Sequence, residues 1–208
     1  MKNFVKIILL EHIKLLGNGC VRYKDWLNYV GGKFKTHMPT KSKQKGKAFE
    51  REVAQFLTSL YDKSFTRVPD SGAFTGGKNS FRKDHLTEGQ IRAHKGDIIP
   101  PDEWKYLNIE CKSYSSFPFH QLFSNTSIPI LEAWIEQTLE AADTGDCSTL
   151  LMKFNRIGRY IAYQLPQNFI TYRHVDYQDK NQNTWRFTSF DDFFTLNKTE
   201  FQTRCLGK

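Results

Sequence analysis

YLNIECKS, residues 106–113, combines the alternation of a β-strand with two opposite charges on one of its faces. Successive side chains of a strand point to opposite faces, so Glu110 and Lys112 share one face while Ile109 and Cys111 share the other. The apolar pair predicts a face that packs on a core. The other face then presents a carboxylate beside an ammonium group.

A second acid precedes this strand. Asp97 begins the apolar run DII at 97–99, and PPD at 100–102 is typical of a turn. We expect the two strands to form a hairpin that brings the Asp97 carboxylate across from Glu110. Two carboxylates at one point repel each other unless a cation or a proton accompanies them. A hard divalent ion takes oxygen ligands, which makes Mg²⁺ the expected occupant.

A Glu-x-Lys pattern on a strand is also a common surface ion pair, so it does not identify a site by itself. Three further features favour catalysis: the upstream Asp97, a preceding helix that carries Glu50, and the basic charge of the chain. Pro69-Asp70 and Pro101-Asp102 are literal Pro-Asp pairs, but both are predicted in turns, and only Asp97 leads into an apolar strand.

Helical periodicity predicts the elements around this hairpin. A helix is expected at about 47–61, with an apolar stripe of Phe49, Val53, Phe56, Leu57 and Leu60 and with Glu50 at its margin. Further predicted elements are a short strand at 65–68, a long loop at 70–95, a helix at 129–142, strands at 149–154 and 160–163, and a short helix near 191–196. This order predicts an α/β or α+β domain with a mixed sheet.

Composition limits the functional classes. The 208 residues are 39% hydrophobic and 14% aromatic, which is too rich for a disordered chain, and the net charge of +8 favours a polyanionic partner. Four scattered cysteines without a CxxC pair predict a reducing compartment and no zinc site. No apolar stretch is long enough to cross a bilayer. We therefore expect a cytoplasmic protein that makes no membrane contact.

Several quoted segments together resemble the archaeal-type Holliday junction resolvases of the PD-(D/E)XK nuclease superfamily. They are KGKAFERE at 45–52, Arg67, Ser71-Gly72, Gly96-Asp97-Ile98, IECKS at 109–113 and LLMKF at 150–154. The resemblance covers roughly residues 45–154. It departs from the family in Gly96, which replaces the proline of the nominal Pro-Asp pair, and in a longer 71–97 segment.

The resemblance implies a restriction-endonuclease-like core, a central mixed sheet flanked by helices, which we place at 41–208. The first 40 and the last 45 residues have no counterpart in the family, and the helical spacing of the first of these segments predicts an N-terminal helical extension at 1–40. It implies that Asp97, Glu110 and the backbone carbonyl of Cys111 bind Mg²⁺, for which Mn²⁺ would substitute, and that Lys112 is the catalytic lysine. Glu50 would complete the acidic site. The DNA-facing positions would be Lys45, Lys47, Arg51, Arg67, Ser71 and Lys153.

These expectations describe a Mg²⁺-dependent, structure-selective DNA endonuclease, acting as a homodimer on branched or double-stranded DNA and encoded by a phage or mobile element. The alternatives are a restriction-like, nicking or genome-processing endonuclease on the same fold, or a DNA-binding module without activity. His85 and His94 are expected to be loop residues. The tail residues Tyr172, Arg173, His174, Trp185, Arg186 and Phe187 fit either a DNA or dimer contact or core packing.

Overall fold

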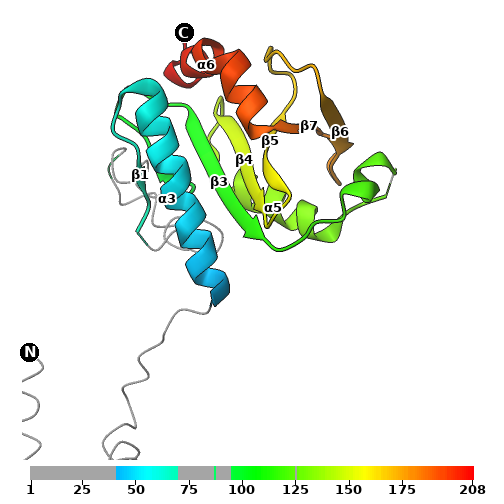
Figure 1. Cartoon of the computed structure of the whole chain (residues 1–208). Coiled ribbons are helices and arrows are strands. Elements are labelled where there is room, and N and C mark those ends of the chain that lie inside the picture. The colour runs from blue at the N-terminus through cyan, green and yellow to red at the C-terminus, as the bar shows by residue number, and fades with distance from the viewer. Residues whose placement is uncertain (1–40, 70–86, 88–94, 125) are drawn as a thin grey trace, which may run out of the picture. The chain divides into compact units, whose positions relative to one another are not determined.

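A five-stranded mixed sheet forms the centre of the protein in the computed structural model, which describes residues 41–69, 87, 95–124 and 126–208 (Figure 1). The strand order is β3-β4-β5-β7-β6. The strands are β3 (Leu107–Tyr114), β4 (Cys147–Phe154), β5 (Gly158–Gln164), β6 (His174–Gln178) and β7 (Thr184–Ser189). The predicted helical extension at 1–40 and most of the predicted 70–95 loop lie outside the described residues.

One parallel pair interrupts an otherwise antiparallel sheet. β3 and β4 run parallel, with Lys112 opposite Met152, and every other neighbouring pair is antiparallel. The crossover between the parallel strands carries α5 (Pro129–Glu140), preceded by a short 3₁₀ helix, η2 (Phe119–Phe123). This leaves β3 and β6 as the two edge strands, so one side of β3 is open to other parts of the chain.

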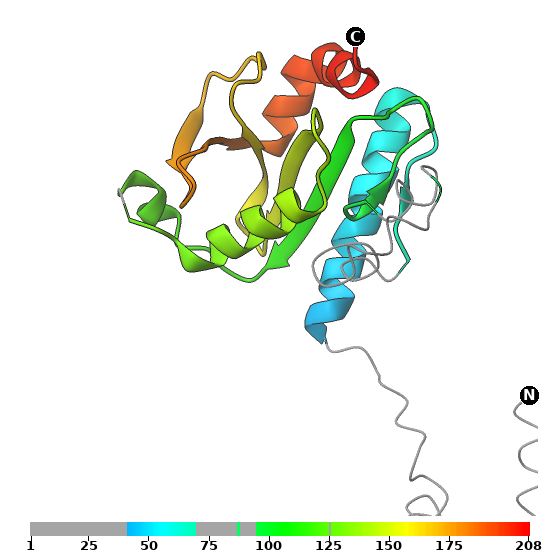
Figure 2. The same ribbon diagram turned by 180° about the vertical axis from the view of Figure 1, so that it is seen from behind.

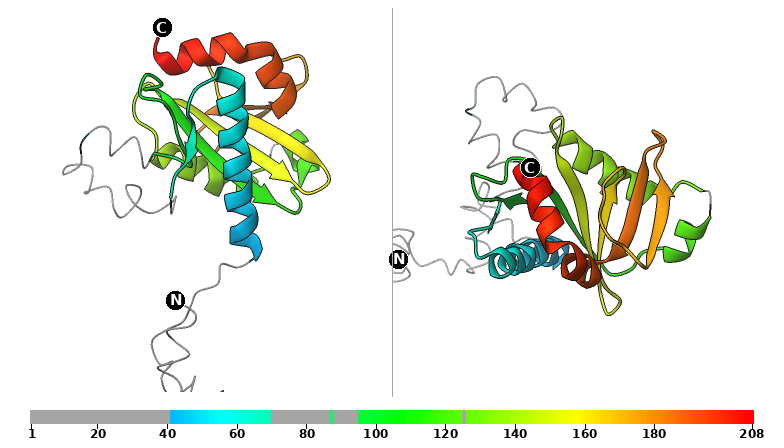
Figure 3. Two further views of the ribbon diagram at one scale, coloured as in Figure 1. Left: turned by 60° about the vertical axis from the view of Figure 1, so that its left-hand side comes forward. Right: turned by 90° about the horizontal axis from the view of Figure 1, so that it is seen from above.

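Helices cover both faces of the sheet. α3 (Lys41–Tyr61) and α6 (Phe190–Leu206) lie on one face, and α5 lies on the other, as Figures 2 and 3 show from behind and from above. The core is accordingly split in two. One cluster joins α3, α6 and the sheet around Leu57, Ile109 and Phe201, and the other joins α5 and the sheet around Trp134 and Leu150. The expected mixed sheet flanked by helices is confirmed.

The predicted hairpin between 97–99 and the following strand is wrong. β2 (Ile98–Ile99) pairs instead with β1 (Thr66–Arg67) in a separate two-stranded antiparallel sheet. The prolines at 100 and 101 have no N–H to donate, so the strand that begins at Asp97 cannot extend past Ile99 to form the predicted hairpin ladder with β3. Trp104 donates its N–H to the carbonyl of Pro101 at 2.9 Å, which closes the turn expected there.

The C-terminal part contains more regular structure than predicted. β6 and β7 were not predicted as strands, and the short helix expected near 191–196 is a 17-residue helix, α6. Its N-cap is Ser189, whose side chain accepts a hydrogen bond from the N–H of Asp192, and its C-cap is Gly207 in the left-handed region. Asn197 has non-helical backbone angles, so α6 bends there. No helix in the described ranges is both long and apolar enough to span a membrane.

Candidate active site

The edge strand β3 carries the charged pair on the face that the alternation predicts. Ile109 and Cys111 belong to the core cluster beneath α3, and Lys112 reaches α5 on the opposite face. Glu110 is 4% exposed, so its carboxylate is buried rather than part of a surface ion pair. The ammonium group of Lys112 lies 2.5 Å from Oε1 of Glu110. The two charges therefore form one buried unit between β3 and α5.

Asp97 is attached to the open edge of β3. Its N–H donates to the carbonyl of Ile109 at 2.7 Å, and its Oδ2 accepts the N–H of Cys111 at 2.8 Å. Its own carbonyl accepts the N–H of Val68 from beside β1 at 3.0 Å. The carboxylate thus reaches β3 without the predicted hairpin, because Asp97 lies between β1 and β3 and bonds to both.

Gly96 makes this approach possible. Its φ of +63° lies in the left-handed region, and a Cβ at this position would fall 2.4 Å from the carbonyl oxygen of Ile109. A backbone oxygen cannot move aside as a flexible side chain can. The residue that replaces the nominal proline is therefore the only type that lets Asp97 lie against the strand.

The carboxylates of Asp97 and Glu110 act on each other. Burial raises the pKa of Glu110 to about 7, and the nearby Asp97 carboxylate contributes to that rise, while Lys112 opposes both effects. Burial also raises the pKa of the Cys111 thiol, with smaller contributions from the carboxylates of Asp97, Glu110 and Glu50. The carboxylates of Asp97, Glu110 and Glu50 therefore all lie close enough to the middle of β3 to interact electrostatically with Cys111.

Glu50 comes to this cluster from α3. It is 8% exposed, and burial followed by the Asp97 carboxylate raises its pKa. Arg67 of β1 donates its Nε–H to Oε2 of Glu50 and opposes that rise, as does Lys47 one turn earlier on α3. Glu50 lies at the margin of the apolar stripe, as predicted, and its carboxylate is held by an ion pair from the strand beside it.

The donor set fits a divalent cation. An extended residue directs its N–H and C=O to the same side of a strand, so the Cys111 carbonyl points to the edge where Asp97 accepts the Cys111 N–H. Two carboxylates and a carbonyl are hard oxygen ligands, and Mg²⁺ is commonly held by one or two carboxylates together with water and substrate phosphate. Within the described ranges, no group of three or more His, Cys, Asp and Glu side chains is arranged to hold a metal alone. A cation here would therefore need backbone, water or substrate oxygens as well.

Two polar residues support the centre and carry no simple sequence signal. Gln137 of α5 accepts a hydrogen bond from Nζ of Lys112 at 2.6 Å. Lys95 is 6% exposed and forms ion pairs with Asp143, at 3.0 Å, and with Asp146 in the turn after α5. Gln137 is 25 residues from Lys112, and only its place beside the apolar stripe of α5 distinguishes it. Lys95 lies two residues before Asp97 and fixes that end of the segment.

The predicted DNA-facing residues are distributed over several elements. Lys45 and Arg51 are exposed on α3, and Lys47 is half-buried one turn before Glu50. Arg67 forms an ion pair with Glu50. Lys153 extends from the α3 face of β4, where it pairs with Glu52 at 2.5 Å and lies over the ring of Phe49. The structure does not bring Lys153 to the face occupied by Lys112, and Ser71 lies outside the described residues.

The other residues considered in the sequence analysis are the alternative Pro-Asp pairs, the loop histidines and the tail. Asp102 is exposed in the turn before β3, as predicted, whereas Asp70, His85 and His94 lie outside the described residues. Trp185 and Phe187 of the tail are buried in the core, while Tyr172, Arg173 and His174 are exposed. Core packing is therefore confirmed for Trp185 and Phe187, Arg186 is half-buried and pairs with Asp176, and a DNA or dimer contact of the exposed residues stays a prediction.

Comparison with known proteins identifies a family for most of the chain. A family model described as "Phage putative PDDEXK endonuclease" matches residues 41–203, which is most of the chain and includes every described element from α3 to most of α6. No curated protein and no solved structure matches the chain significantly. Nucleases of the PD-(D/E)XK superfamily act on DNA and generally use divalent metal ions. The chain belongs to the phage PD-(D/E)XK endonuclease family.

Proposed function

We propose that the protein is a Mg²⁺-dependent, structure-selective DNA endonuclease similar to the Holliday junction resolvases. The observation that carries this proposal is the convergence of Asp97, Glu110 and Lys112 at the open edge of β3. Four elements meet there, β1, β3, α3 and α5, and each contributes a charged or polar group. A buried cluster of this kind is costly to assemble for stability alone, because buried charges lose their hydration.

Asp97, Glu110 and the Cys111 carbonyl would hold the cation, with Glu50 as an additional acid. Once bound, the ion would polarise a scissile phosphate and lower the pKa of a water molecule, and Mn²⁺ would serve as well as Mg²⁺. The protein's own part is to keep both carboxylates fixed. The two hydrogen bonds of Asp97 to β3 and the ion pair of Glu110 with Lys112 do this before substrate arrives.

Lys112 would be the catalytic lysine. Its ammonium group donates to Glu110 and to Gln137, which hold it on the α5 side of the acidic centre. From there it would orient the attacking water or stabilise the charge that develops on the phosphate.

The DNA backbone would be contacted by basic residues near the centre. Lys45, Lys47 and Arg51 lie in the N-terminal half of α3, on the same helix as Glu50. Arg67, Ser71 and Lys153 are further candidates. Each phosphate contact would release counterions, so the affinity for DNA should fall steeply as salt rises. Two symmetric cuts require two sites, and we therefore expect a homodimer.

The direct test measures DNA cleavage by the purified protein in Mg²⁺. Asp97→Asn and Glu110→Gln should each lower the cleavage rate by at least about 10²-fold, the scale of losing an electrostatic catalytic group, while DNA binding is retained. Glu103→Gln is the matched control, because Glu103 is an exposed acid that pairs with Lys63 at 3.2 Å. If Asp97→Asn cleaves DNA at the wild-type rate, Asp97 is not a catalytic residue.

A second assay separates the substrate classes. The enzyme is offered a four-way junction and a linear duplex of the same sequence, and a resolvase should cut the junction much faster. Equal rates on both would favour a restriction-like, nicking or genome-processing role. DNA binding without cleavage in any divalent ion would instead indicate a binding module.

A further inference from the structure

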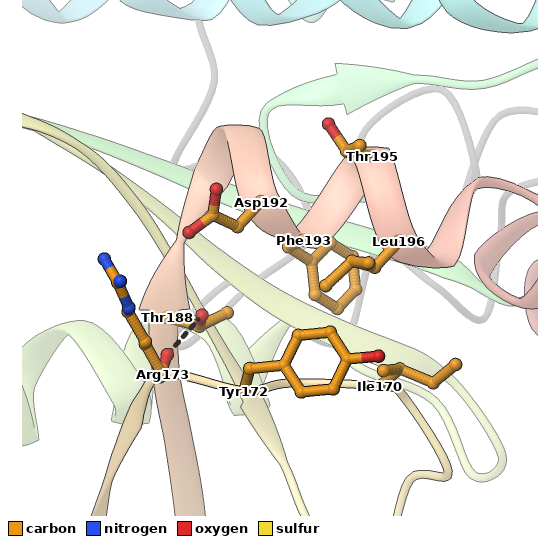
Figure 4. Close-up of a pocket in the computed structure, with 8 residues that line it drawn as sticks. All are labelled: Ile170, Tyr172, Arg173, Thr188, Asp192, Phe193, Thr195 and Leu196. Carbon is orange, nitrogen blue, oxygen red and sulfur yellow. Dashed lines mark hydrogen bonds between the residues drawn. The ribbon is translucent and has the colours of Figure 1, made fainter.

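A hollow opens on the face of the molecule where α6 begins. It has a volume of about 380 Å³, within the range of small-ligand sites, roughly 300–1,000 Å³. Figure 4 shows Phe193 and Leu196 of α6 facing the ring of Tyr172, with Ile170 beside that ring and Arg173 at the other end. The hollow therefore combines an apolar wall, an exposed aromatic ring and a cation.

One wall of the hollow is the loop between β5 and β6, residues 165–173, which we call the Tyr172 loop. This loop exposes large side chains. Tyr172 is 80% exposed and Ile170 is 46% exposed, whereas Phe169 in the same loop is buried in the core. Arg173 and His174 follow directly, and both are exposed. An exposed aromatic residue beside an arginine is the composition of a surface that stacks on bases and contacts phosphates.

This loop is held rigidly. Asn197, fully buried at the bend of α6, accepts the N–H of Ile170 at 2.6 Å and donates to the carbonyl of the same residue at 2.8 Å. Thr188 donates its hydroxyl to the carbonyl of Arg173 at 2.7 Å. The backbone on both sides of Tyr172 is thus fixed before any ligand binds, which lowers the entropic cost of binding.

We propose that this hollow is a seat for one unpaired nucleotide of the DNA substrate. The ring of Tyr172 would stack on the base, Arg173 would contact its phosphate, and Asp192 at the rim would accept a hydrogen bond from an exocyclic amine. The inference rests on the proposed function and adds to it, because an unpaired base distinguishes a branched or frayed substrate from a continuous duplex.

The seat and the acidic centre would contact different nucleotides. The Tyr172 loop leads into β6, four strands from β3, and neighbouring strands lie about 4.8 Å apart. The strand register places Lys112, Met152, Tyr160 and Ser189 in one row, and His174 pairs beside that row with Thr188. The two sites therefore lie at about the same height of the sheet and roughly 20 Å apart across its width, with the hollow on the α6 face and Lys112 on the α5 face.

The charge around the hollow favours nucleic acid, rather than a second copy of the chain, as its ligand. Arg173 attracts a polyanion, and the whole chain carries a net +8. Two copies meeting face to face across a twofold axis would bring their Arg173 side chains toward each other, which disfavours a symmetric contact. A second copy remains an outcome that the experiment can detect.

The experiment measures binding of a fluorescent 12-nucleotide oligo-dC and of a perfect duplex by anisotropy, with the full chain in EDTA so that no cleavage occurs. Tyr172→Ala should weaken oligo-dC binding about tenfold, in the range for removing one stacked ring, and Tyr172→Phe should retain it. Phe123→Ala is the matched control, because Phe123 is 78% exposed but lies on η2 outside the hollow. Duplex binding should change little in all three.

The charge contact has its own control. Arg173→Gln and Arg156→Gln each remove one exposed cation, but only Arg173 lines the hollow. The seat predicts a larger loss of oligo-dC binding for Arg173→Gln, whereas equal losses would mean general electrostatic attraction and overturn it. Oligo-dT, which has no exocyclic amine, should bind more weakly than oligo-dC, and Asp192→Asn should reduce that difference.

The remaining outcomes separate this inference from the proposed function. If Tyr172→Ala binds oligo-dC like wild type while the wild-type enzyme cuts DNA in Mg²⁺, the seat is wrong and the nuclease proposal stands. If Tyr172→Ala halves the sedimenting mass without weakening oligo-dC binding, the hollow is an interface between copies and the seat is wrong. If Tyr172 supports oligo-dC binding in a protein that never cuts, the seat stands and the catalytic proposal fails.

Discussion

Gly96 shows at the scale of one residue how backbone geometry sets the catalytic centre. Gly96→Ala would place a methyl group 2.4 Å from the Ile109 carbonyl oxygen and would force the Asp97–Ile109 hydrogen bond to lengthen. Gly145→Ala is the matched control. Gly145 also has a positive φ, +89°, but its nearest neighbour would be the ring of Tyr106 at an ordinary 3.6 Å.

We therefore expect the free energy of unfolding of Gly145→Ala to fall by about 1–2 kcal/mol, the cost of an alanine in the left-handed region, with cleavage retained. Gly96→Ala should lose more stability and nearly all cleavage, because Asp97 is displaced. Urea unfolding and a cleavage assay of both variants check this. Full activity in Gly96→Ala would mean that the position of Asp97 is not critical.

Glu110 gives a prediction about pH for the metal-free protein. Its ordinary pKa is 4.5 and its pKa in the folded state is about 7, chiefly because of burial. Between these values the folded state binds more protons than the unfolded state, so the free energy of unfolding falls as pH rises. The destabilisation begins above pH 4.5 and is complete above pH 7.

Glu110→Gln cannot ionise and should lack this component. In EDTA, wild type should lose stability relative to Glu110→Gln between about pH 5 and pH 8, by up to about 3 kcal/mol at roughly 1.36 kcal/mol per pKa unit. Urea unfolding of both proteins at the two pH values measures the difference. Parallel pH dependence in the two proteins would show that Glu110 titrates normally.

At the scale of elements, α5 is a positioning helix for β3. Gln137 accepts from Lys112, so Gln137→Ala should leave the ammonium group bound to Glu110 alone and free to reorient. We expect kcat to fall roughly tenfold to hundredfold with little change in KM, the effect of misplacing a catalytic group. Glu136→Gln, on the adjacent exposed position that pairs with Lys180, is the control for general damage to α5. A change in KM alone would mean that Gln137 contacts substrate instead.

Local patterns predicted most of these elements, and long-range pairing was where they failed. Strand alternation placed Glu110 and Lys112 on one face, and helical periodicity placed Glu50 beside the packed stripe of α3. The predicted partner strand of 97–99 was wrong. The pairing of this two-residue strand depends on the position of β1, which no local sequence pattern shows. Gln137 was missed for the same reason: its contact with Lys112 joins two elements across a crossover.

At the scale of the whole molecule, the tail shows what sequence patterns omit. Residues 174–189 alternate polar and aromatic residues, yet Tyr177, Trp185 and Phe187 are buried because α5 and η2 cover that face of the sheet. α6 is similarly long because Phe193 and Phe201 complete the core beneath α3. The expected separation of 41–208 from 1–40 is a further prediction at this scale.

The buried apolar residues of both clusters fall between Phe49 and Cys205, and the family match begins at residue 41. A chain of residues 41–208 should therefore fold with a Tm within about 2–4 °C of the full chain, the shift that ~1 kcal/mol produces at this size. It should also cut DNA, since α3, β1, β3, α5 and Asp97 just before β2 supply every residue proposed for the centre. Thermal unfolding with a cleavage assay checks both points, and a failure to fold would place part of the core in residues 1–40.

The same truncation has an electrostatic consequence that is independent of folding. Residues 1–40 contain seven Lys and Arg against two Asp and Glu, so they carry +5 of the chain's +8. If these charges neutralise phosphates of duplex DNA, the slope of log affinity against log salt should become shallower by about 0.9 for each phosphate that the truncated chain leaves free. Equal slopes for the full chain and residues 41–208 would confine DNA binding to the nuclease domain. The basic residues of 41–208 would then have to account for the whole salt dependence.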